Sequence, residues 1–335
     1  MIELLRQLCT LDGTSGDEGA VRKFVISQIK DCCEYRIDNL GNIIAFKKGK
    51  KTPSKKTLID AHLDEVGLII TSIDQNGFLR FKTVGGVDTA ALLFHRVLIN
   101  GKTVGVIGGK PIHLTGGDER KKLPNADNLY IDIGAKDDTQ ARTLVREGDR
   151  AVMCSDFTVI GNKILTKALD DRVGCAILIK LLQKQAEYDF YASFSTGEEI
   201  GLRGARVAAY SVDPDAAIVI DGTTAADIAG VANENQVCRQ GLGAVVSFMD
   251  GATAYDREYY NAALSSGISS QSKCAVAGGN NAGAIHLSRG GVRTLALSVP
   301  CRYIHTAGSV ADFRDIDAVY KLCEYMINKI ASDRL

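Results

Sequence analysis

Residues 56–67, Lys-Thr-Leu-Ile-Asp-Ala-His-Leu-Asp-Glu-Val-Gly, decide how this chain is organised. The apolar pair at the centre of residues 56–61 predicts a buried strand, and His62 and Asp64 follow directly after it. Beyond Gly67 the pattern changes from strands alternating with helices to short β runs separated by glycine-containing turns. This stretch therefore marks the end of a core strand and the start of a second structural unit.

The rest of the chain alternates helical and strand patterns. We expect helices at 1–30, 170–185, 202–209 and 316–330, and strands at 56–61, 188–196, 216–220 and 292–299. This alternation predicts a largely parallel sheet covered on both faces. Short β runs at 68–73, 78–84, 96–99 and 104–107 predict a small barrel. The prediction is an α/β domain made of residues 1–66 and 162–335, interrupted by a β-rich insertion at 67–161.

Composition limits the classes of partner. The 335 residues carry 40 Lys plus Arg against 40 Asp plus Glu, so the net charge gives no reason to expect nucleic acid or an anionic membrane surface as a partner. A local lysine-rich stretch at 47–56 predicts a solvated hairpin tip. No apolar run approaches the length of a membrane span.

Cysteine usage and the amino terminus predict a cytoplasmic protein. The nine cysteines are an odd number and form no Cys-x-x-Cys pair, a pattern typical of free thiols in a reducing compartment. Residues 1–6 are amphipathic and contain no apolar signal core.

Acidic residues and histidines follow the predicted strands. In open α/β sheets, ligands bind beyond the carboxyl ends of the strands. The residues at these positions, or opening the helix at 170, are His62, Asp64, Asp170, Asp171, Glu198, Glu199, Asp221 and His305. The sequence therefore predicts that carboxylates and two of the five histidines gather at one edge of the sheet.

Each of these residues also has a structural interpretation. His62 alone could be a hydrogen-bonded core histidine, and Asp171 could be a helix N-cap. Glu198 and Glu199 could be first-turn acids of a helix, and Asp221 could belong to a plain turn. The other three histidines, His95, His113 and His286, fall outside the pattern and are interpreted as structural or surface residues.

The whole set favours a metal site. Two or three carboxylates with two histidines suit Zn²⁺, Co²⁺ or Mn²⁺ better than Ca²⁺. So many like charges need cations to share one pocket. A further carboxylate that is not a ligand could take a proton from the attacking water, so the class indicated is a metal-dependent hydrolase.

Four ordered motifs resemble the glutamyl aminopeptidase/cellulase M family, whose best-known members are tetrahedral (TET) aminopeptidases. The motifs are residues 60–67, 167–174, 197–205 and 302–305. Flanking similarity is found at 85–86, 111–114, 119–122 and 129–135. The resemblance covers nearly the whole chain in order, which makes the set far more specific than any single motif.

The resemblance implies a zinc-peptidase-like mixed sheet sandwiched by helices, with the insertion acting as a β-barrel-like dimerisation domain that also borders substrate access. It implies two divalent ions per subunit, zinc above all, with cobalt or manganese as alternatives. The ligands implied for one ion are His62 and Asp221, those for the other are Glu199 and His305, and Asp170 bridges both.

The same resemblance assigns the remaining roles. Glu198 resembles the general base, and Asp64 resembles a carboxylate that orients the first histidine ligand. The peptide between Asp170 and Asp171 resembles one that is cis in the family. The implied activity is release of amino-terminal residues from peptides, and the implied assembly is a homo-oligomer built from dimers, up to a tetrahedral dodecamer.

Two departures and three alternative functions remain. Asn280 and Asn281 stand where relatives commonly carry Thr-Asp, which affects the expected recognition of the substrate amine, and Cys301 stands where threonine is common. A deacylase or carboxypeptidase could use the same metal site. A glycosidase needs carboxylates on both sides of the scissile bond, which adjacent Glu198 and Glu199 do not suit, and a non-catalytic binding protein would be expected to lose ligands first.

Overall fold

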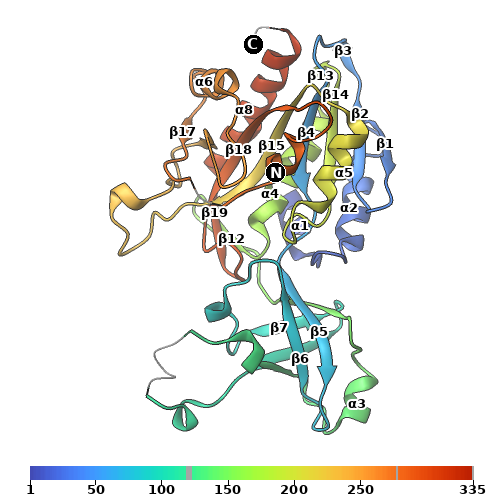
Figure 1. The fold of residues 1–335 in the computed structure, drawn as a ribbon, viewed down its shortest axis with the longest axis vertical. Coiled ribbons are helices and arrows are strands. Elements are labelled where there is room, and N and C mark those ends of the chain that lie inside the picture. Colours follow the sequence, from blue (N-terminus) through green and yellow to red (C-terminus); the bar gives the residue numbers. More distant parts are fainter. Residues whose placement is uncertain (118–122, 277, 334–335) are drawn as a thin grey trace.

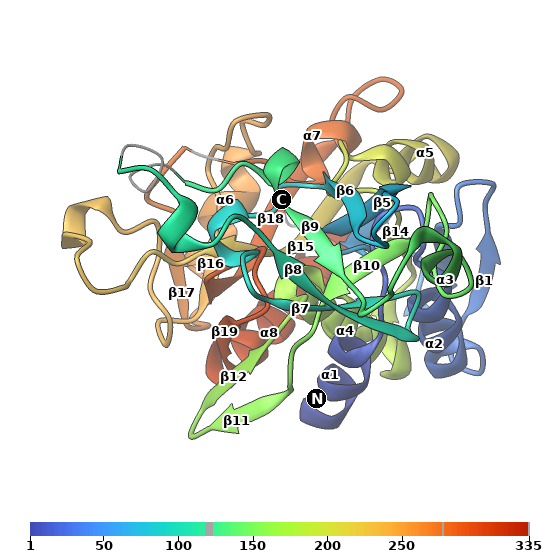
Figure 2. The same ribbon diagram turned by 90° about the horizontal axis from the view of Figure 1, so that it is seen from below.

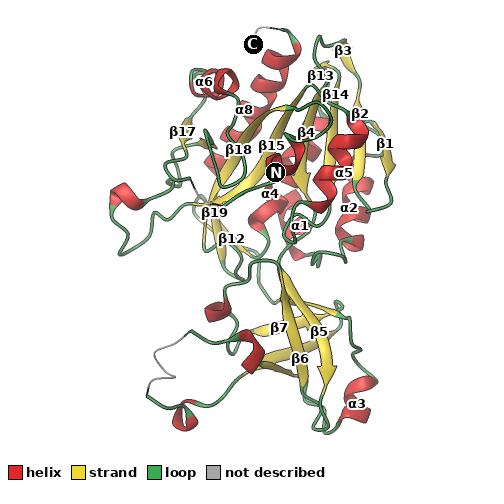
Figure 3. Cartoon of the chain, viewed as in Figure 1, coloured by secondary structure: helices red, strands yellow, loops and turns green. Residues whose placement is uncertain are grey.

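The computed structural model describes residues 1–117, 123–276 and 278–333, so the flanking motif at 119–122 lies outside the described residues. Figure 1 shows a large part, in which helices cover a sheet, and a smaller part below it. Colouring by secondary structure shows that the smaller part consists mainly of strands and loops (Figure 3). Within the described residues, no helix combines the length and the apolar character needed to cross a membrane.

The large part is built on one mixed sheet of 11 strands with the main order β1-β2-β14-β4-β15-β18-β19-β12-β11. Two short strands, β16 and β17, extend it beside β18. The strands in that order are β1 (Glu34–Ile37), β2 (Ile43–Lys47), β14 (Phe190–Ser195), β4 (Thr57–His62), β15 (Ala216–Thr224), β18 (Arg293–Arg302), β19 (Ser309–Asp312), β12 (Lys163–Thr166), β11 (Thr158–Ile160), β16 (Ala244–Val246) and β17 (Ser270–Ser272).

The expectation of a largely parallel sheet was wrong, whereas the mixed sheet implied by the family resemblance is confirmed. Along the main order, parallel pairing is confined to the four central strands β14, β4, β15 and β18, which run parallel to one another. The outer strands pair antiparallel, and short turns join two of these pairs. Residues 38–42 form the predicted turn between β1 and β2, and a turn at Gly161 joins β11 to β12.

Helices cover both faces of this sheet. The α-helices are α1 (Ile2–Thr10), α2 (Gly19–Ile29), α3 (Asp138–Arg142), α4 (Leu169–Gln183), α5 (Arg203–Val212), α6 (Arg257–Leu264), α7 (Ala282–Ile285) and α8 (Phe313–Ala331). Short 3-10 turns lie at Thr89–Ala91, Ile112–Leu114, Ala126–Asn128 and Asn233–Asn235. Seen from below, α5 and α7 lie on one side of the strands and α1, α4 and α8 on the other (Figure 2).

Alternating residues of the central strands pack in two separate apolar cores, one on each face of the sheet. Ile218 and Ile220 pack in the larger core with α1, α4 and α8, whereas Ala217 and Val219 pack in a smaller core with α5 and α7. Successive strand residues point to opposite faces, so a strand buried on both sides needs this continuous apolar run. The central strands are therefore covered by packed helices on both faces.

The first 30 residues form two helices instead of the one expected. The break falls at residues 11–18, where the chain turns to contact the strand end after β4. Gly13 donates its backbone N–H to Glu65 Oε1 at 3.1 Å, and a Cβ at this glycine would lie 2.6 Å from Arg172 Nη2. A tertiary contact therefore overrides the helical pattern.

The insertion is a closed six-stranded barrel with its own apolar core, as predicted. In barrel order its strands are β10 (Arg150–Met153), β5 (Gly67–Ile73), β6 (Leu79–Val84), β9 (Tyr130–Asp132), β8 (Thr103–Gly108) and β7 (Arg96–Ile99). The barrel strands end at Met153, and β11 pairs with β12 of the large sheet. By strand pairing, residues 158–160 therefore go with the large sheet and not with the barrel.

The predicted strand at 188–196 is divided at Asp189. Before the division, β13 (Ala186–Tyr188) pairs in parallel with β3 (Gly49–Lys51). The side chain of Asp189 accepts hydrogen bonds from Lys48 Nζ at 2.9 Å and from the backbone N–H of Gly49 at 2.7 Å. Residues 49–51 of the lysine-rich stretch therefore form a strand paired with β13, not the hairpin tip that was expected, while the side chains of Lys48, Lys50 and Lys51 are solvent-exposed as predicted.

Candidate active site

All five predicted metal ligands lie together at one edge of the large sheet. His62 is the last residue of β4, and Asp221 lies in the neighbouring strand β15. Asp170 lies at the start of α4, and Glu199 follows β14, which runs parallel to β4 with Ser195 opposite His62. The fifth, His305, follows β18. The carboxyl ends of the parallel strands thus converge as the alternation predicted.

Asp170 lies between the two imidazole rings. Its Oδ1 is 3.1 Å from His62 Nε2, and its Oδ2 is 3.2 Å from His305 Nε2. Around this centre, His62 Nε2 lies 3.8 Å from Asp221 Oδ1, and His305 Nε2 lies 3.4 Å from Glu199 Oε1. The five side chains therefore form two groups that share one carboxylate.

The donor set fits divalent cations. The Nδ1 atoms of His62 and His305 lie 3.0 and 2.9 Å from the backbone carbonyl oxygens of Asp64 and Gly86, which accept their protons. A neutral ring bonded in this way would turn the lone pair of its Nε2 toward a carboxylate oxygen, which calls for positive charge in between, from a metal ion or from a second proton on the ring. Ligating histidines usually give their other ring nitrogen to a carbonyl or carboxylate in this way.

A buried oxygen without a partner supports the same conclusion. Glu199 Oε1 is buried and has no hydrogen-bond partner among the described residues. An unsatisfied buried polar atom is costly unless a ligand or ion completes its contacts.

Electrostatics at the site show how crowded the negative charge is. Burial, reinforced by Asp170, raises the pKa of Glu198 to about 7 and that of Glu199 to about 8. Burial alone would raise the pKa of Asp170, but hydrogen bonds with His305 and His62 hold that pKa far below its ordinary value. Divalent cations would supply the positive charge that so many buried carboxylates need.

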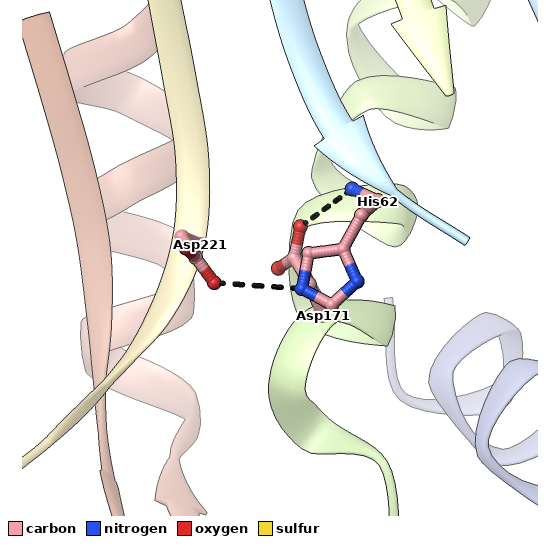
Figure 4. A group of neighbouring side chains, drawn as sticks. All are labelled: His62, Asp171 and Asp221. Carbon is pink, nitrogen blue, oxygen red and sulfur yellow. Dashed lines mark hydrogen bonds and ion pairs between the residues drawn. The ribbon is translucent and has the colours of Figure 1, made fainter. Parts of the chain in front are cut away.

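Asp171 is held by backbone donors. Its Oδ2 accepts the N–H of His62 at 3.1 Å, and its Oδ1 accepts the N–H of Gly174 at 2.9 Å, as an N-cap does. Figure 4 shows His62 reaching Asp221 with its ring and Asp171 with its backbone nitrogen. The Asp170–Asp171 peptide is cis, as the resemblance implied. Asp171 therefore fits the N-cap interpretation, although its carboxylate also lies within ligand distance of the group.

Asp64 lies against the turn that carries the two glutamates. Its Oδ1 accepts the backbone N–H of Glu198 at 3.0 Å, and its Oδ2 accepts that of Glu199 at 3.1 Å and the hydroxyl of Ser15 at 2.6 Å. The same carboxylate is 3.5 Å from the Nδ1 of His62, whose hydrogen bond goes to the Asp64 backbone oxygen instead. Asp64 thus contacts the Glu198-Glu199 turn through its carboxylate and the ring of His62 through its backbone oxygen.

The barrel also contributes to the site. Its strand β6 leads into Gly85 and Gly86, and the carbonyl of Gly86 accepts a hydrogen bond from His305 Nδ1. A Cβ at Gly85, which has a φ of +80°, would lie 3.1 Å from Glu199 Cβ. The glycine pair at 85–86 thus permits a close approach between the barrel and the metal-site side chains.

A cavity of about 190 Å³ opens beside the carboxylates. Asp170, Glu198, Glu199, Asp221 and His305 line one side of it, and the other lining residues include Val237, Lys273 and Asn280. Val237 and Lys273 lie on connections and Thr223 and Thr224 end β15, and none of the four belongs to a motif that stood out in the sequence.

The two sequence departures lie outside the ligand set. Asn281 is buried away from the cavity lining, and its Nδ2 donates to Asp60 Oδ2 at 2.7 Å and to Ser195 Oγ at 2.9 Å. Its neighbour Asn280 does line the cavity. Cys301 is buried and burial raises its pKa well above the ordinary value, which fits a packed small residue.

The three histidines set aside in the sequence lie apart from this cluster. His95 and His286 make ring contacts with backbone carbonyls of Cys154 and Ala282, at 2.9 and 2.7 Å, and His113 is an exposed residue of a 3-10 turn.

A helix-covered mixed sheet, an inserted barrel and this site define the class of the protein as a peptide hydrolase. The chain belongs to the M42 glutamyl aminopeptidase family, whose sequence profile matches residues 41–322.

Similar proteins span the full chain. A protein from Acetivibrio thermocellus, named provisionally as an aminopeptidase, is 36% identical over 334 residues, which is 96% of this chain and 97% of that protein. The structure of an aminopeptidase from the archaeon Desulfurococcus kamchatkensis is 34% identical with a TM-score of 0.93, over 98% of this chain and 94% of that one. A Pyrococcus horikoshii TET1 peptidase, described as able to assemble into a tetrahedron or a large octahedral shell, is 32% identical with a TM-score of 0.85, over 99% of each chain.

Proposed function

We propose that this protein is an aminopeptidase that removes amino-terminal residues from peptides with the help of two divalent metal ions. The observation that carries the proposal is the carboxylate of Asp170, whose two oxygens face the Nε2 atoms of two separate imidazoles. His62 and Asp221 would hold one ion, Glu199 and His305 the other, and Asp170 both. Zinc is the proposed metal, with cobalt or manganese as alternatives.

When bound, such ions polarise the scissile carbonyl and lower the pKa of the attacking water. The other steps belong to side chains. Glu198 lines the cavity, and its backbone is held by Asp64, so its carboxylate is placed to take a proton from the water and return it to the departing amine. The cavity wall with Val237, Lys273 and Asn280 would receive the first residue of the peptide.

We further propose that the protein acts as a homo-oligomer built from dimers, up to a tetrahedral dodecamer, and that the barrel is the dimerisation domain. The barrel exposes apolar side chains in support of this: Phe94 is 66% exposed, and Val104 and Val106 on β8 are 54% and 41% exposed. A cytoplasmic location is proposed on the basis of the nine unpaired cysteines.

Hydrolysis by the metal-free protein reloaded with Zn²⁺, Co²⁺ or Mn²⁺ tests the function. A panel of aminoacyl and N-acylated aminoacyl substrates separates an aminopeptidase from a deacylase. We expect release of the first residue from free-amine substrates only, and only after metal is returned. Turnover of acylated substrates, or undiminished turnover after chelation, would overturn the proposal.

A further inference from the structure

Three charged residues of the metal-site motifs have no role in the chemistry above. Glu65 follows Asp64 in the first motif, and Lys167 and Arg172 flank Asp170 and Asp171 in the second. They are 4%, 6% and 0% exposed, respectively. Long charged side chains are rarely buried to this extent unless they are paired, so their position calls for a reason.

The three side chains meet in one cluster. Lys167 Nζ donates to both carboxylate oxygens of Glu65, at 2.8 and 2.9 Å, and Arg172 Nη2 donates to Glu65 Oε1 at 3.1 Å. Both cations also bind the carboxyl end of α1: Lys167 Nζ donates to the carbonyl of its C-cap residue Leu11 at 2.9 Å, and Arg172 Nη1 donates to that of Leu8 in its last turn at 2.7 Å.

The chain connectivity gives this cluster its significance. Asp170 lies three residues after Lys167 and two residues before Arg172, so the segment that carries it is fixed at both ends to one carboxylate. That carboxylate, Glu65, lies three residues after His62. Glu65 and Lys167 also line the same small cavity as Asp170 and His305. One buried anion therefore connects the two segments whose side chains face each other in the site.

We propose that Glu65, Lys167 and Arg172 form an ionic anchor that positions Asp170 against His62 before any metal binds. The three are positioning residues, since none of them lines the larger cavity beside the carboxylates. A purely structural ion cluster would stabilise the fold without affecting the site. An anchor also sets metal affinity, because partners that orient ligands typically change affinity by about ten- to a hundredfold when they are removed.

Lys167→Met tests the anchor with the least damage to the fold, because Glu65 keeps Arg172 as its counterion. Lys163→Met is the matched control: it begins β12, the strand that directly precedes Lys167, and pairs with Asp312 at 2.8 Å, away from the site. We expect Lys167→Met to bind zinc about ten- to a hundredfold more weakly in competition with a chromophoric chelator. Its kcat should fall with KM little changed, Lys167→Arg should recover much of the affinity, and Lys163→Met should match wild type.

Hydrogen exchange on the metal-free protein gives a readout that needs neither metal nor turnover. The backbone N–H of Arg172, bonded to the carbonyl of Ala168 at 3.2 Å, should exchange slowly in wild type and in Lys163→Met, and faster in Lys167→Met. If Lys167→Met does not fold, hydrogen exchange in metal-free wild type tests the anchor by itself. Rapid exchange of the Arg172 N–H would contradict the anchor, and slow exchange would support it.

The inference about metal affinity rests on the proposed function, but the two can fail separately. Wild-type protein that binds no zinc would contradict the proposed function, while the exchange pattern would still test the anchor. Zinc binding by Lys167→Met as tight as by Lys163→Met, with equal protection at Arg172, would overturn the anchor and leave the proposed function intact.

Discussion

The carboxylate of Asp64 accepts the backbone N–H of Glu198 through Oδ1 at 3.0 Å, across 134 positions of sequence. Its other oxygen accepts the N–H of Glu199 at 3.1 Å. One buried carboxylate thus fixes the turn that carries both the proposed general base and a proposed metal ligand, while its backbone carbonyl fixes the ring of His62. The strand end at β4 and the strand end at β14 are therefore held as one unit.

Asp64→Asn should lower kcat/KM by about ten- to a hundredfold, because an amide offers only one acceptor oxygen to the two N–H groups. Steady-state kinetics with a free-amine substrate measure the effect. Asp74→Asn is the matched control, since Asp74 also accepts two backbone N–H groups, from Asn76 and Phe78, in a remote barrel turn. Equal activity in the two variants would show that Asp64 does not position the glutamates.

Glu198→Gln should keep metal and lose turnover. The amide cannot take a proton from water, so kcat should fall by about a hundred- to ten-thousandfold, the range typical of a general base. Metal content by atomic absorption and kcat are measured together. Glu234→Gln, at an exposed residue of a 3-10 turn, is the control. Turnover near that of the control would exclude Glu198 as the general base.

His62→Ala and His305→Ala should each reduce the zinc content from two ions to one or fewer per subunit, because each ring belongs to a different group around Asp170. Equilibrium dialysis followed by metal analysis measures the stoichiometry. His286→Ala removes a ring bonded to a backbone carbonyl away from the site and should retain both ions. Two ions retained in His305→Ala would remove that residue from the ligand set.

The sequence predicted where the site lies better than it predicted which side chains hold the site residues in place. Four of the five proposed ligands could be found because they lie at or after the ends of apolar strands, and parallel strands end at one sheet edge, whereas Asp170 was found as a residue opening a helix. The link between Asp64 and the Glu198-Glu199 turn could not be found, because a side chain bonded to a distant backbone N–H leaves no pattern in the sequence. The family resemblance connected Asn281 with recognition of the substrate amine, and its bond to the Asp60 side chain inside the sheet became visible only in the structure.

The fold, like the site, could be predicted from the sequence only in part. The central strands and the barrel could be predicted from apolar runs and turn glycines, which depend on local sequence. The antiparallel edges of the sheet and the assignment of β11 to it depend on which strands hydrogen-bond, and the break after α1 depends on a contact between Gly13 and Glu65. Tertiary pairing of this kind overrides local pattern.

Stability should depend on pH through Asp312, the N-cap of α8. Burial alone would raise its pKa, but Arg314 and Lys163 hold that pKa well below the ordinary value. A lowered folded-state pKa contributes stability that is present above the unfolded pKa of about 3.9 and is lost as pH falls through the folded value. Asp312→Asn, which keeps a capping oxygen, should therefore be less stable than wild type at pH 7 and approach it below pH 4.

The size of this difference should be modest. Arg314 is largely exposed and Lys163 is partly exposed, so solvent screening limits the loss in unfolding free energy to about 1 kcal/mol. Urea unfolding at pH 7 and pH 3 measures it, and Asp317→Asn, which removes an exposed pair with Lys321, is the control. A deficit that is as large at pH 3 as at pH 7 would show that charge on Asp312 is not its source.

Anomalous diffraction from crystals grown with zinc tests the central claim most directly, because it locates the ions and counts them. We predict two zinc peaks on either side of the Asp170 carboxylate, one beside His62 and Asp221 and the other beside His305 and Glu199. Zinc peaks away from Asp170, or no bound zinc at these side chains, would contradict the account.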